Sequence, residues 1–171
     1  TLTKTKILSG LQCHKKLWFD LHDPRKKEHN WILEKGFRFE NIVRENYSKN
    51  YGKVLDLSGD WEDVVSKTML GIKSNDIEVI FEGAFIYLDT LVRADVLIKN
   101  KKGWELLEIK SSTKLKDAHI SDIAIQSFIV KKCGVNLTSV KLIHVNEDFT
   151  YTSDGNYKDL INFENEITDE V

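Results

Sequence analysis

Asp95, Glu108 and Lys110 are residues whose types and spacing could support chemistry on a phosphate ester. Asp and Glu are poor strand residues, yet both carboxylates lie between apolar neighbours. Carboxylate oxygens are the ligands that Mg²⁺ prefers, and a bound cation polarises a phosphoryl oxygen and lowers the pKa of its water. A lysine beside such an ion orients the nucleophile or offsets developing negative charge. The alternative is a surface hairpin that carries scattered charge.

A β-hairpin is expected to position these side chains. Two apolar runs, rich in β-branched and aromatic residues, precede and follow residues 100–103, a polar turn that ends in glycine. If Lys99 lies opposite Trp104, Asp95 lies opposite Glu108, because side chains alternate between the two faces of a strand. Facing carboxylates repel each other. This register therefore predicts that a divalent cation binds between them.

The rest of the chain is expected to build one sheet around the hairpin. A strand precedes the hairpin, and a helix followed by another strand comes after it. Such a crossover is right-handed, so the last strand should run parallel to the second strand of the hairpin. The predicted strands are 78–87, 90–99, 103–111 and 139–145, and the predicted flanking helices are 36–49 and 117–132.

Two further helices are expected earlier in the chain. One begins at Thr3 or Thr5 and runs to about residue 21, and another runs from residue 58 or 60 to about residue 73. Cys13 lies inside the first of them, where a small buried hydrophobic residue is the ordinary interpretation.

Glu40 and Gln126 are polar residues on the expected inner faces of helices. Glu40 follows the helical spacing of the buried positions 36, 43 and 47, so its carboxylate points toward the sheet. Gln126 lies in an apolar helix, and a buried amide needs hydrogen-bond partners. From spacing alone, a half-exposed helix residue is the favoured interpretation of Glu40. For Gln126, a side chain that binds a backbone group is as good an interpretation as one that belongs to a site.

These residues together resemble the PD-(D/E)xK nuclease superfamily, in particular its RecB-like branch. Asp95 followed by Glu108, Ile109 and Lys110 is similar to the superfamily signature, with alanine where the signature name has proline. The segment 36–40 is similar to the helix motif that supplies a further metal ligand, and Gln126 matches the glutamine after the E-x-K strand.

The resemblance implies an α/β fold with a restriction-endonuclease-like core. In that core a mixed four-stranded sheet, a three-stranded antiparallel meander plus one parallel strand, is flanked by helices. The implied ligands of Mg²⁺ or Mn²⁺ are Asp95, Glu108, the Ile109 carbonyl and Glu40. The implied catalytic residues are Asp95, Glu108, Lys110, which orients the attacking water, and Gln126, which fixes Lys110 or the substrate phosphate.

The chain also resembles an uncharacterised bacterial family related to CRISPR-associated RecB-like exonucleases. Some RecB-like nucleases bind an iron–sulfur cluster through an N-terminal cysteine and three cysteines near the domain's end. Cys13 could be one such ligand in a longer protein, but Cys133 is the other cysteine of the chain, and four thiolates are usually required. An iron–sulfur cluster is therefore not expected. The expected organisation is a nuclease domain over 1–150 and an acidic tail over 151–171.

The composition is that of a soluble globular protein, and the net charge of −2 argues against a generic nucleic-acid binder, although the distribution of charge matters more. Hydrophobic residues make up 41% of the chain and no apolar run is long enough to span a membrane, so a cytoplasmic protein without a membrane partner is expected. Residues 147–171 hold eight Asp/Glu and one lysine, which leaves 24 Lys/Arg against 19 Asp/Glu in the rest. Basic clusters lie at 15–16, 25–27, 99–102 and 110–116. Phosphates could bind there, and solvated lysines on an ordinary surface are the alternative for each cluster.

The expected function is metal-dependent hydrolysis of phosphodiester bonds in nucleic acid, with DNA favoured over RNA. A catalytically inactive nucleic-acid-binding module with the same fold is the main alternative, and a small-molecule phosphodiesterase is another.

Overall fold

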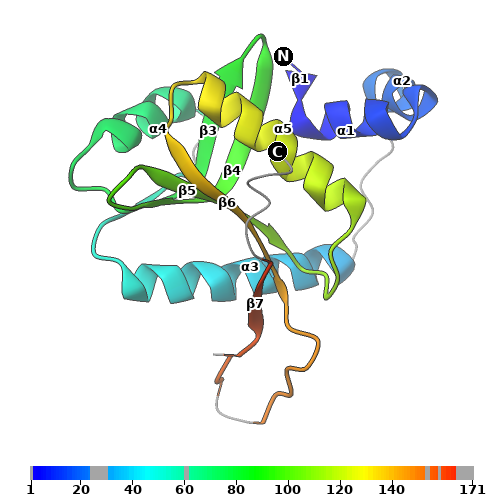
Figure 1. Ribbon diagram of the computed structural model, residues 1–171. Coiled ribbons are helices and arrows are strands. Elements are labelled where there is room, and N and C mark those ends of the chain that lie inside the picture. Colours follow the sequence, from blue (N-terminus) through cyan, green and yellow to red (C-terminus); the bar gives the residue numbers. More distant parts are fainter. Residues whose placement is uncertain (1, 24–30, 60–61, 153–154, 158, 165–171) are drawn as a thin grey trace.

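The protein forms a mixed sheet covered by helices on both faces (Figure 1). The structure is a computed structural model, and it describes residues 2–23, 31–59, 62–152, 155–157 and 159–164. The sheet order is β2-β3-β4-β5-β6-β7, and β1 pairs with β4 off this path. The strands are β1 (Leu2–Thr3), β2 (Val54–Asp56), β3 (Val79–Tyr87), β4 (Thr90–Lys99), β5 (Trp104–Lys110), β6 (Leu137–Val145) and β7 (Ile161–Glu164).

Helices lie on both sides of this sheet. In Figure 1, α3 runs along one side of the sheet and α5 along the other, whereas α1 and α2 project from one end. The helices are α1 (Lys4–Gln12), α2 (His14–His22), α3 (Trp31–Asn50), α4 (Val64–Lys73) and α5 (Asp117–Lys132).

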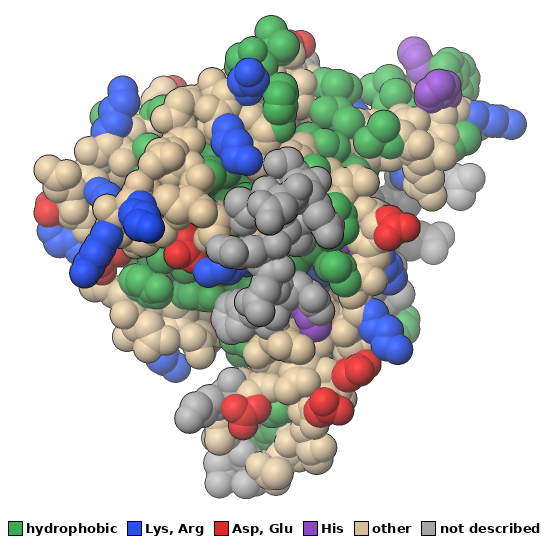
Figure 2. All heavy atoms as spheres, in the orientation of Figure 1, with side chains coloured by type: hydrophobic (Ala, Val, Ile, Leu, Met, Phe, Trp, Pro, Cys, Tyr) green, Lys and Arg blue, Asp and Glu red, His purple; other side chains and the backbone are tan. Residues whose placement is uncertain are grey.

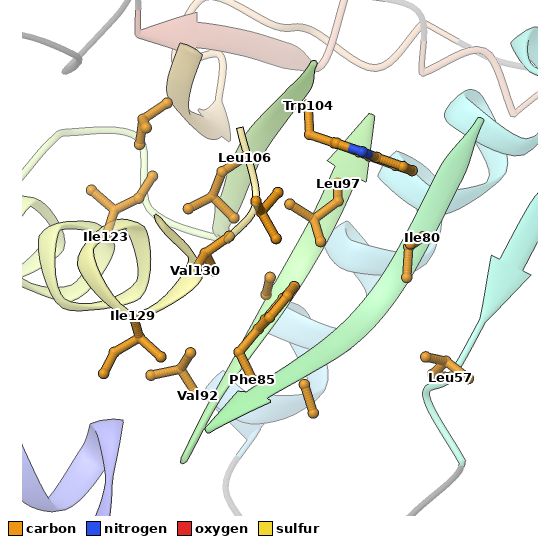
Figure 3. Close-up of a cluster of buried hydrophobic side chains, with 14 of the residues drawn as sticks. Leu57, Ile80, Phe85, Val92, Leu97, Trp104, Leu106, Ile123, Ile129 and Val130 are labelled. Carbon is orange, nitrogen blue, oxygen red and sulfur yellow. The ribbon is translucent and has the colours of Figure 1, made fainter. Parts of the chain in front are cut away.

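The larger hydrophobic core lies between the sheet and α5. Leu97 of β4 and Leu106 of β5 pack with Ile123 and Val130 of α5, and all four side chains are fully buried (Figure 3). Burying each such side chain stabilises the fold by about 1.5–3 kcal/mol. Glu108 continues the face of Leu106 along β5, so this core directs its carboxylate toward Gln126 of α5.

The smaller core packs α3 against the opposite face. Phe39, Val43 and Tyr47 are spaced by four residues and form the buried stripe of α3. They contact Phe81 of β3 and Leu107 of β5, among others.

The predicted meander and crossover are confirmed. Strands β3, β4 and β5 are consecutively antiparallel, and β6 runs parallel to β5 after α5. The predicted pairing of Lys99 with Trp104 is present. The coarse prediction of a mixed α/β protein with helices flanking one sheet is therefore correct.

The sheet extends beyond the four predicted strands at three places. Strand β2 lies between two predicted helices, where no strand is predicted, and it pairs in parallel with β3. Strand β7 lies within the expected acidic tail and pairs with β6. Both are short, at three and four residues, and β1 has only two. Pairing with neighbouring strands determines that such short segments are strands. They are too short to show the hydrophobic periodicity of a strand in their own sequence.

The predicted N-terminal helix is interrupted. Thr3 caps α1 by accepting a hydrogen bond from the Lys6 amide, as expected, but Cys13 is extended at φ −169°, and α2 begins after it. A Cβ at Gly10 would lie 3.2 Å from a Leu17 methyl group. The glycine thus leaves room for Leu17 of α2 to lie against α1. Cys13 is exposed, so the expectation of a buried cysteine is wrong.

Candidate active site

The candidate site lies where β4 and β5 separate. Their ladder runs from Lys99 opposite Trp104 to Val96 opposite Leu107 and ends there. In place of the next ladder pair, the Ile109 amide donates a hydrogen bond of 2.7 Å to the Asp95 carboxylate. At the far end of β4, β1 takes the edge that β5 no longer covers, with Leu2 beside Thr90 and Thr3 beside Leu91. The two strands therefore form a fork, and Asp95 lies at its opening.

Asp95 is in an environment that disfavours its charge. Burial raises the pKa of Asp95 well above its usual value, and the neighbouring Glu108 raises it further. Lys4 and the Ile109 amide act in the opposite direction but do not outweigh them. A cation beside Asp95 and Glu108 would favour the ionised form of Asp95.

Glu108 is fully enclosed by polar partners. Its side chain is 2% exposed. Its Oε1 accepts hydrogen bonds from Lys110 Nζ at 2.6 Å and from Lys4 Nζ at 3.1 Å. Its Oε2 accepts a hydrogen bond from the amide nitrogen of Gln126. The structure therefore brings three of the predicted residues, Glu108, Lys110 and Gln126, into one cluster, with Asp95 on the adjacent strand.

Asp122 and Lys4 join this cluster, and the sequence argument did not assign either of them to the site. Asp122 lies one helical turn before Gln126 on α5, and both are buried. Its carboxylate pairs with Lys4 Nζ at 2.8 Å and with Lys110 Nζ. The signal for Asp122 was its spacing of four from Gln126 in an otherwise apolar helix. Lys4 had no comparable signal, because β1 brings it to the site from the start of the chain.

The two lysines and Asp122 hold one another in their charged forms. Burial alone would lower the pKa of Lys110 and of Lys4, but Glu108 and then Asp122 raise both above their usual value. Burial likewise opposes ionisation of Asp122, but Lys4 and Lys110 lower its pKa. Two ammonium groups and two carboxylates, those of Glu108 and Asp122, thus form a closed ring of ion pairs.

Glu40, a predicted metal ligand, pairs with an arginine of its own helix. Arg44 donates to Glu40 Oε1 at 2.6 and 3.0 Å, to Glu82 Oε1 at 2.9 Å and to Asp56 Oδ1 at 3.3 Å. Glu40 also lines a depression of about 250 Å³ together with Ile109 and Lys110. The structure therefore places Glu40 beside the E-x-K strand with its carboxylate on Arg44.

Glu82 is another acidic residue near the fork that the sequence argument missed. The pairing of β3 with β4 passes from Phe81–Val96 to Gly83–Ala94 without a shift of register, so Glu82 lies opposite Asp95 at an interruption of the ladder. Its φ of +56° is unusual for a residue other than glycine. Arg93 Nε binds Glu82 Oε2 at 3.1 Å. Its carboxylate therefore contacts two arginines, Arg44 and Arg93.

The donor set fits a hydrated hard cation. The described residues contain no group of three or more His, Cys, Asp or Glu arranged to hold a metal ion. Mg²⁺, however, is usually held by one or two carboxylates and keeps several waters, and the fork offers Asp95 and Glu108. Gln126 Oε1 is buried and has no hydrogen-bond partner in the described part of the chain. Such an acceptor normally has one, and a cation or its water would supply it.

Basic and apolar residues outside the fork are distributed unevenly. On the face shown in Figure 2, Lys and Arg side chains are scattered and form no continuous stripe. The predicted basic cluster at 25–27 lies outside the described residues.

On α1 and α2, Leu11, Trp18 and Phe19 are exposed. None of the helices in the described ranges is long and apolar enough to cross a membrane.

Known proteins give few matches. No family model matches the chain. The chain is 23% identical over 139 residues to the "Uncharacterized protein UU173" of Ureaplasma parvum serovar 3. The match covers 75% of this chain and 19% of UU173, so the chain spans about a fifth of that relative's length. A solved structure, "Crystal structure of SSO0001", aligns over 95% of this chain and 77% of its own at 16% identity, with a TM-score of 0.31. Neither description names an activity.

Proposed function

We propose that the chain is a metal-dependent nuclease domain of the PD-(D/E)xK superfamily, RecB-like branch, that hydrolyses phosphodiester bonds of DNA. The observation that carries the proposal is the fork between β4 and β5. There Asp95 accepts a hydrogen bond from the Ile109 amide, and Glu108 and Lys110 lie on the facing strand. The order of the meander, α5 and β6 matches the restriction-endonuclease-like core that the resemblance implies.

Asp95, Glu108 and the Ile109 carbonyl would hold Mg²⁺ or Mn²⁺. Glu40 would join them on leaving Arg44, directly or through water. When bound, the cation would polarise the phosphoryl oxygen and make water a better nucleophile. Gln126 would keep Glu108 in place through its amide nitrogen.

Lys110 would act on the phosphate. Its ammonium group is held at the opening of the fork by Glu108 and Asp122 and has three donor hydrogens. One donor directed at the phosphate would offset the negative charge that develops in the transition state. The pKa of Lys110 is raised, so the group carries its proton throughout and serves as a fixed charge.

A cleavage assay tests the proposal. The chain is incubated with end-labelled single- and double-stranded DNA in the presence of Mg²⁺, Mn²⁺ or EDTA, and Mn²⁺ binding is measured by calorimetry. We expect cleavage with either metal and none with EDTA. Asp95→Ala should abolish both cleavage and Mn²⁺ binding, whereas Asp76→Ala, which removes an exposed carboxylate paired with Lys53, should change neither. Unaltered Mn²⁺ affinity in Asp95→Ala would reject the site.

The ring of ion pairs favours a second candidate, a nucleic-acid-binding module that does not cleave. Lys4 and Lys110 already neutralise Glu108 and Asp122, so these carboxylates do not require a divalent cation. Such a module would bind DNA with a strong salt dependence, and its affinity would be the same in Mn²⁺ and in EDTA. Metal-dependent cleavage that Asp95→Ala abolishes would exclude this candidate.

A further inference from the structure

Asp122 is the residue that connects the two lysines of the site. Its Oδ1 lies 2.8 Å from Lys4 Nζ, and its Oδ2 accepts a hydrogen bond from Lys110 Nζ. Each carboxylate oxygen thus holds one ammonium group, whereas Glu108 uses a single oxygen, Oε1, for both. The Asp122 side chain is 8% exposed.

We propose that Asp122 is a positioning residue that holds Lys110 and Lys4 as a fixed pair of ammonium groups at the phosphate. This role rests on the proposed nuclease function, and it gives both lysines, not Lys110 alone, a place in the site. The geometry places the pair on the side of Glu108 that faces α5.

The different contacts of the Glu108 and Asp122 carboxylates support this role. A cation on Glu108 would compete with both lysines for its oxygens. Asp122 would still keep one oxygen for each lysine, so the ammonium groups would stay in place when Glu108 turns to the cation. Helix α5 fixes both ends of the arrangement, because Asp122 binds the lysines and Gln126, one turn later, binds Glu108.

The backbone around Lys4 is also anchored. The Leu2 amide donates a hydrogen bond of 2.9 Å to the Asp89 carbonyl, and the Thr3 side chain caps α1. Lys4 follows directly as the first residue of that helix and is 18% exposed. A lysine that served only solubility would keep its head group in water. This one is instead placed between two buried carboxylates.

Kinetics of Asp122→Asn test the proposal, because asparagine keeps the shape and removes the charge. Residues that orient a group in the site typically contribute about 10- to 100-fold. We expect kcat to fall by about that factor, with KM and Mn²⁺ affinity within about threefold of the wild type. Asp122→Glu should recover part of the rate. Asp117→Asn, the same change at an exposed position of α5, is the matched control and should leave the rate unaltered.

Three kinetic outcomes would overturn the proposal. A rate within about twofold of wild type would show that neither lysine needs Asp122. Loss of Mn²⁺ binding would make Asp122 a metal ligand. A raised KM with unchanged kcat would assign it to substrate docking.

An NMR measurement separates this proposal from the nuclease function itself. Ammonium groups of buried, hydrogen-bonded lysines exchange slowly enough to be observed in ¹⁵N spectra. The wild type should show such signals for Lys4 and Lys110, assigned by Lys4→Arg and Lys110→Arg. Both signals should exchange faster in Asp122→Asn, which leaves each lysine with one carboxylate oxygen, Glu108 Oε1, and should stay as in the wild type in Asp117→Asn. Unchanged exchange in Asp122→Asn would overturn the role. A wild type that shows both signals but never cleaves DNA would refute the nuclease function instead.

Single-lysine variants keep the proposal testable should Asp122→Asn not fold. Lys4→Met and Lys110→Met each remove one ammonium group. The remaining lysine should keep its signal, because Asp122 still holds it. Loss of the remaining signal in both variants would show that the lysines depend on each other and not on Asp122.

Discussion

Lys110 has two carboxylate partners, and this pairing sets what its removal should do. Its ammonium group contacts Glu108 and Asp122, and both would remain within reach of Lys4 after a substitution. The loss of Lys110 should therefore lower the rate of cleavage more than it lowers the stability of the fold.

Lys110→Ala should bind DNA nearly as well as the wild type but cleave it about a hundredfold more slowly. An interaction made only in the transition state lowers kcat and kcat/KM together. Lys110→Arg should not restore the full rate, since a planar fork does not replace a compact ammonium group. Lys141→Ala, which removes the 2.8 Å ion pair with Glu105, is the control in the same single-turnover assay. A rate within about twofold of the wild type would remove Lys110 from the mechanism.

Asp95 should make the metal-free protein less stable as the pH rises. Its pKa is raised above the ordinary 3.8, so folding favours the protonated form. The contribution of protonated Asp95 to stability is complete below its pKa in the unfolded chain. It is lost as the pH rises through its pKa in the folded protein. In EDTA, Asp95→Asn should match the wild type near pH 4 and melt at a higher temperature near pH 8. Equal melting temperatures of the two proteins at both pH values would contradict a raised pKa of Asp95. Mn²⁺ should raise the melting temperature of the wild type only.

At the residue scale, most residues of the candidate site could be named from the sequence. Asp95 and Glu108 were conspicuous because a charged residue inside an apolar strand is unusual, and Lys110 because it follows Glu108 by two residues, whereas Gln126 was assigned through the family resemblance. Asp122 was visible in the same helix but resembled an ordinary polar residue. Lys4 was not predictable, since the pairing of β1 with β4 that brings it to the site involves only two residues.

At the scale of elements, α3 is attached to the sheet by both hydrophobic and charged contacts. Its apolar stripe packs on Phe81 and Leu107, and Arg44 lies over the Phe81 ring at 5.2 Å. The same arginine joins α3 to β2 and β3 through Asp56 and Glu82. This helix is thereby held against Glu82, next to the fork.

Arg44→Ala should destabilise the protein by about 2 kcal/mol, because Glu40 and Glu82, at 27% and 20% exposure, would lose their shared partner. Urea unfolding measures the change. Arg38→Ala, on the same helix but exposed, should alter the stability by less than about 0.5 kcal/mol. A smaller loss for Arg44 than for Arg38 would show that the arginine cluster does not stabilise the fold.

Elements with a clear hydrophobic period were predictable, and those without one were not. Helix α5 is found at the predicted residues 117–132, and β4 at 90–99, because both are long and apolar. At the break between α1 and α2, Leu17 lies against Gly10, and such a contact depends on the folded chain and not on a period in the sequence. Strands β2 and β7 depend in the same way on β3 and β6.

At the scale of the whole molecule, the site draws on segments from across the sequence. It combines the start of α1, two strands of the meander and the middle of α5. The meander can pair locally, but Lys4 and Glu108 are 104 residues apart.

That separation has a consequence for the order of folding. Closing a loop of such length costs entropy before its contact is gained, so β1 and α1 should dock after the rate-limiting step. Lys4→Met should then leave the refolding rate unchanged and accelerate unfolding, about tenfold for a loss of about 1.4 kcal/mol. Stopped-flow chevron measurements would test this, with Lys6→Met on the same helix as the control. Slower refolding of Lys4→Met would place the N-terminus in the folding nucleus. In the order expected here, a nascent chain would acquire its complete site only after the residues of α5 have left the ribosome.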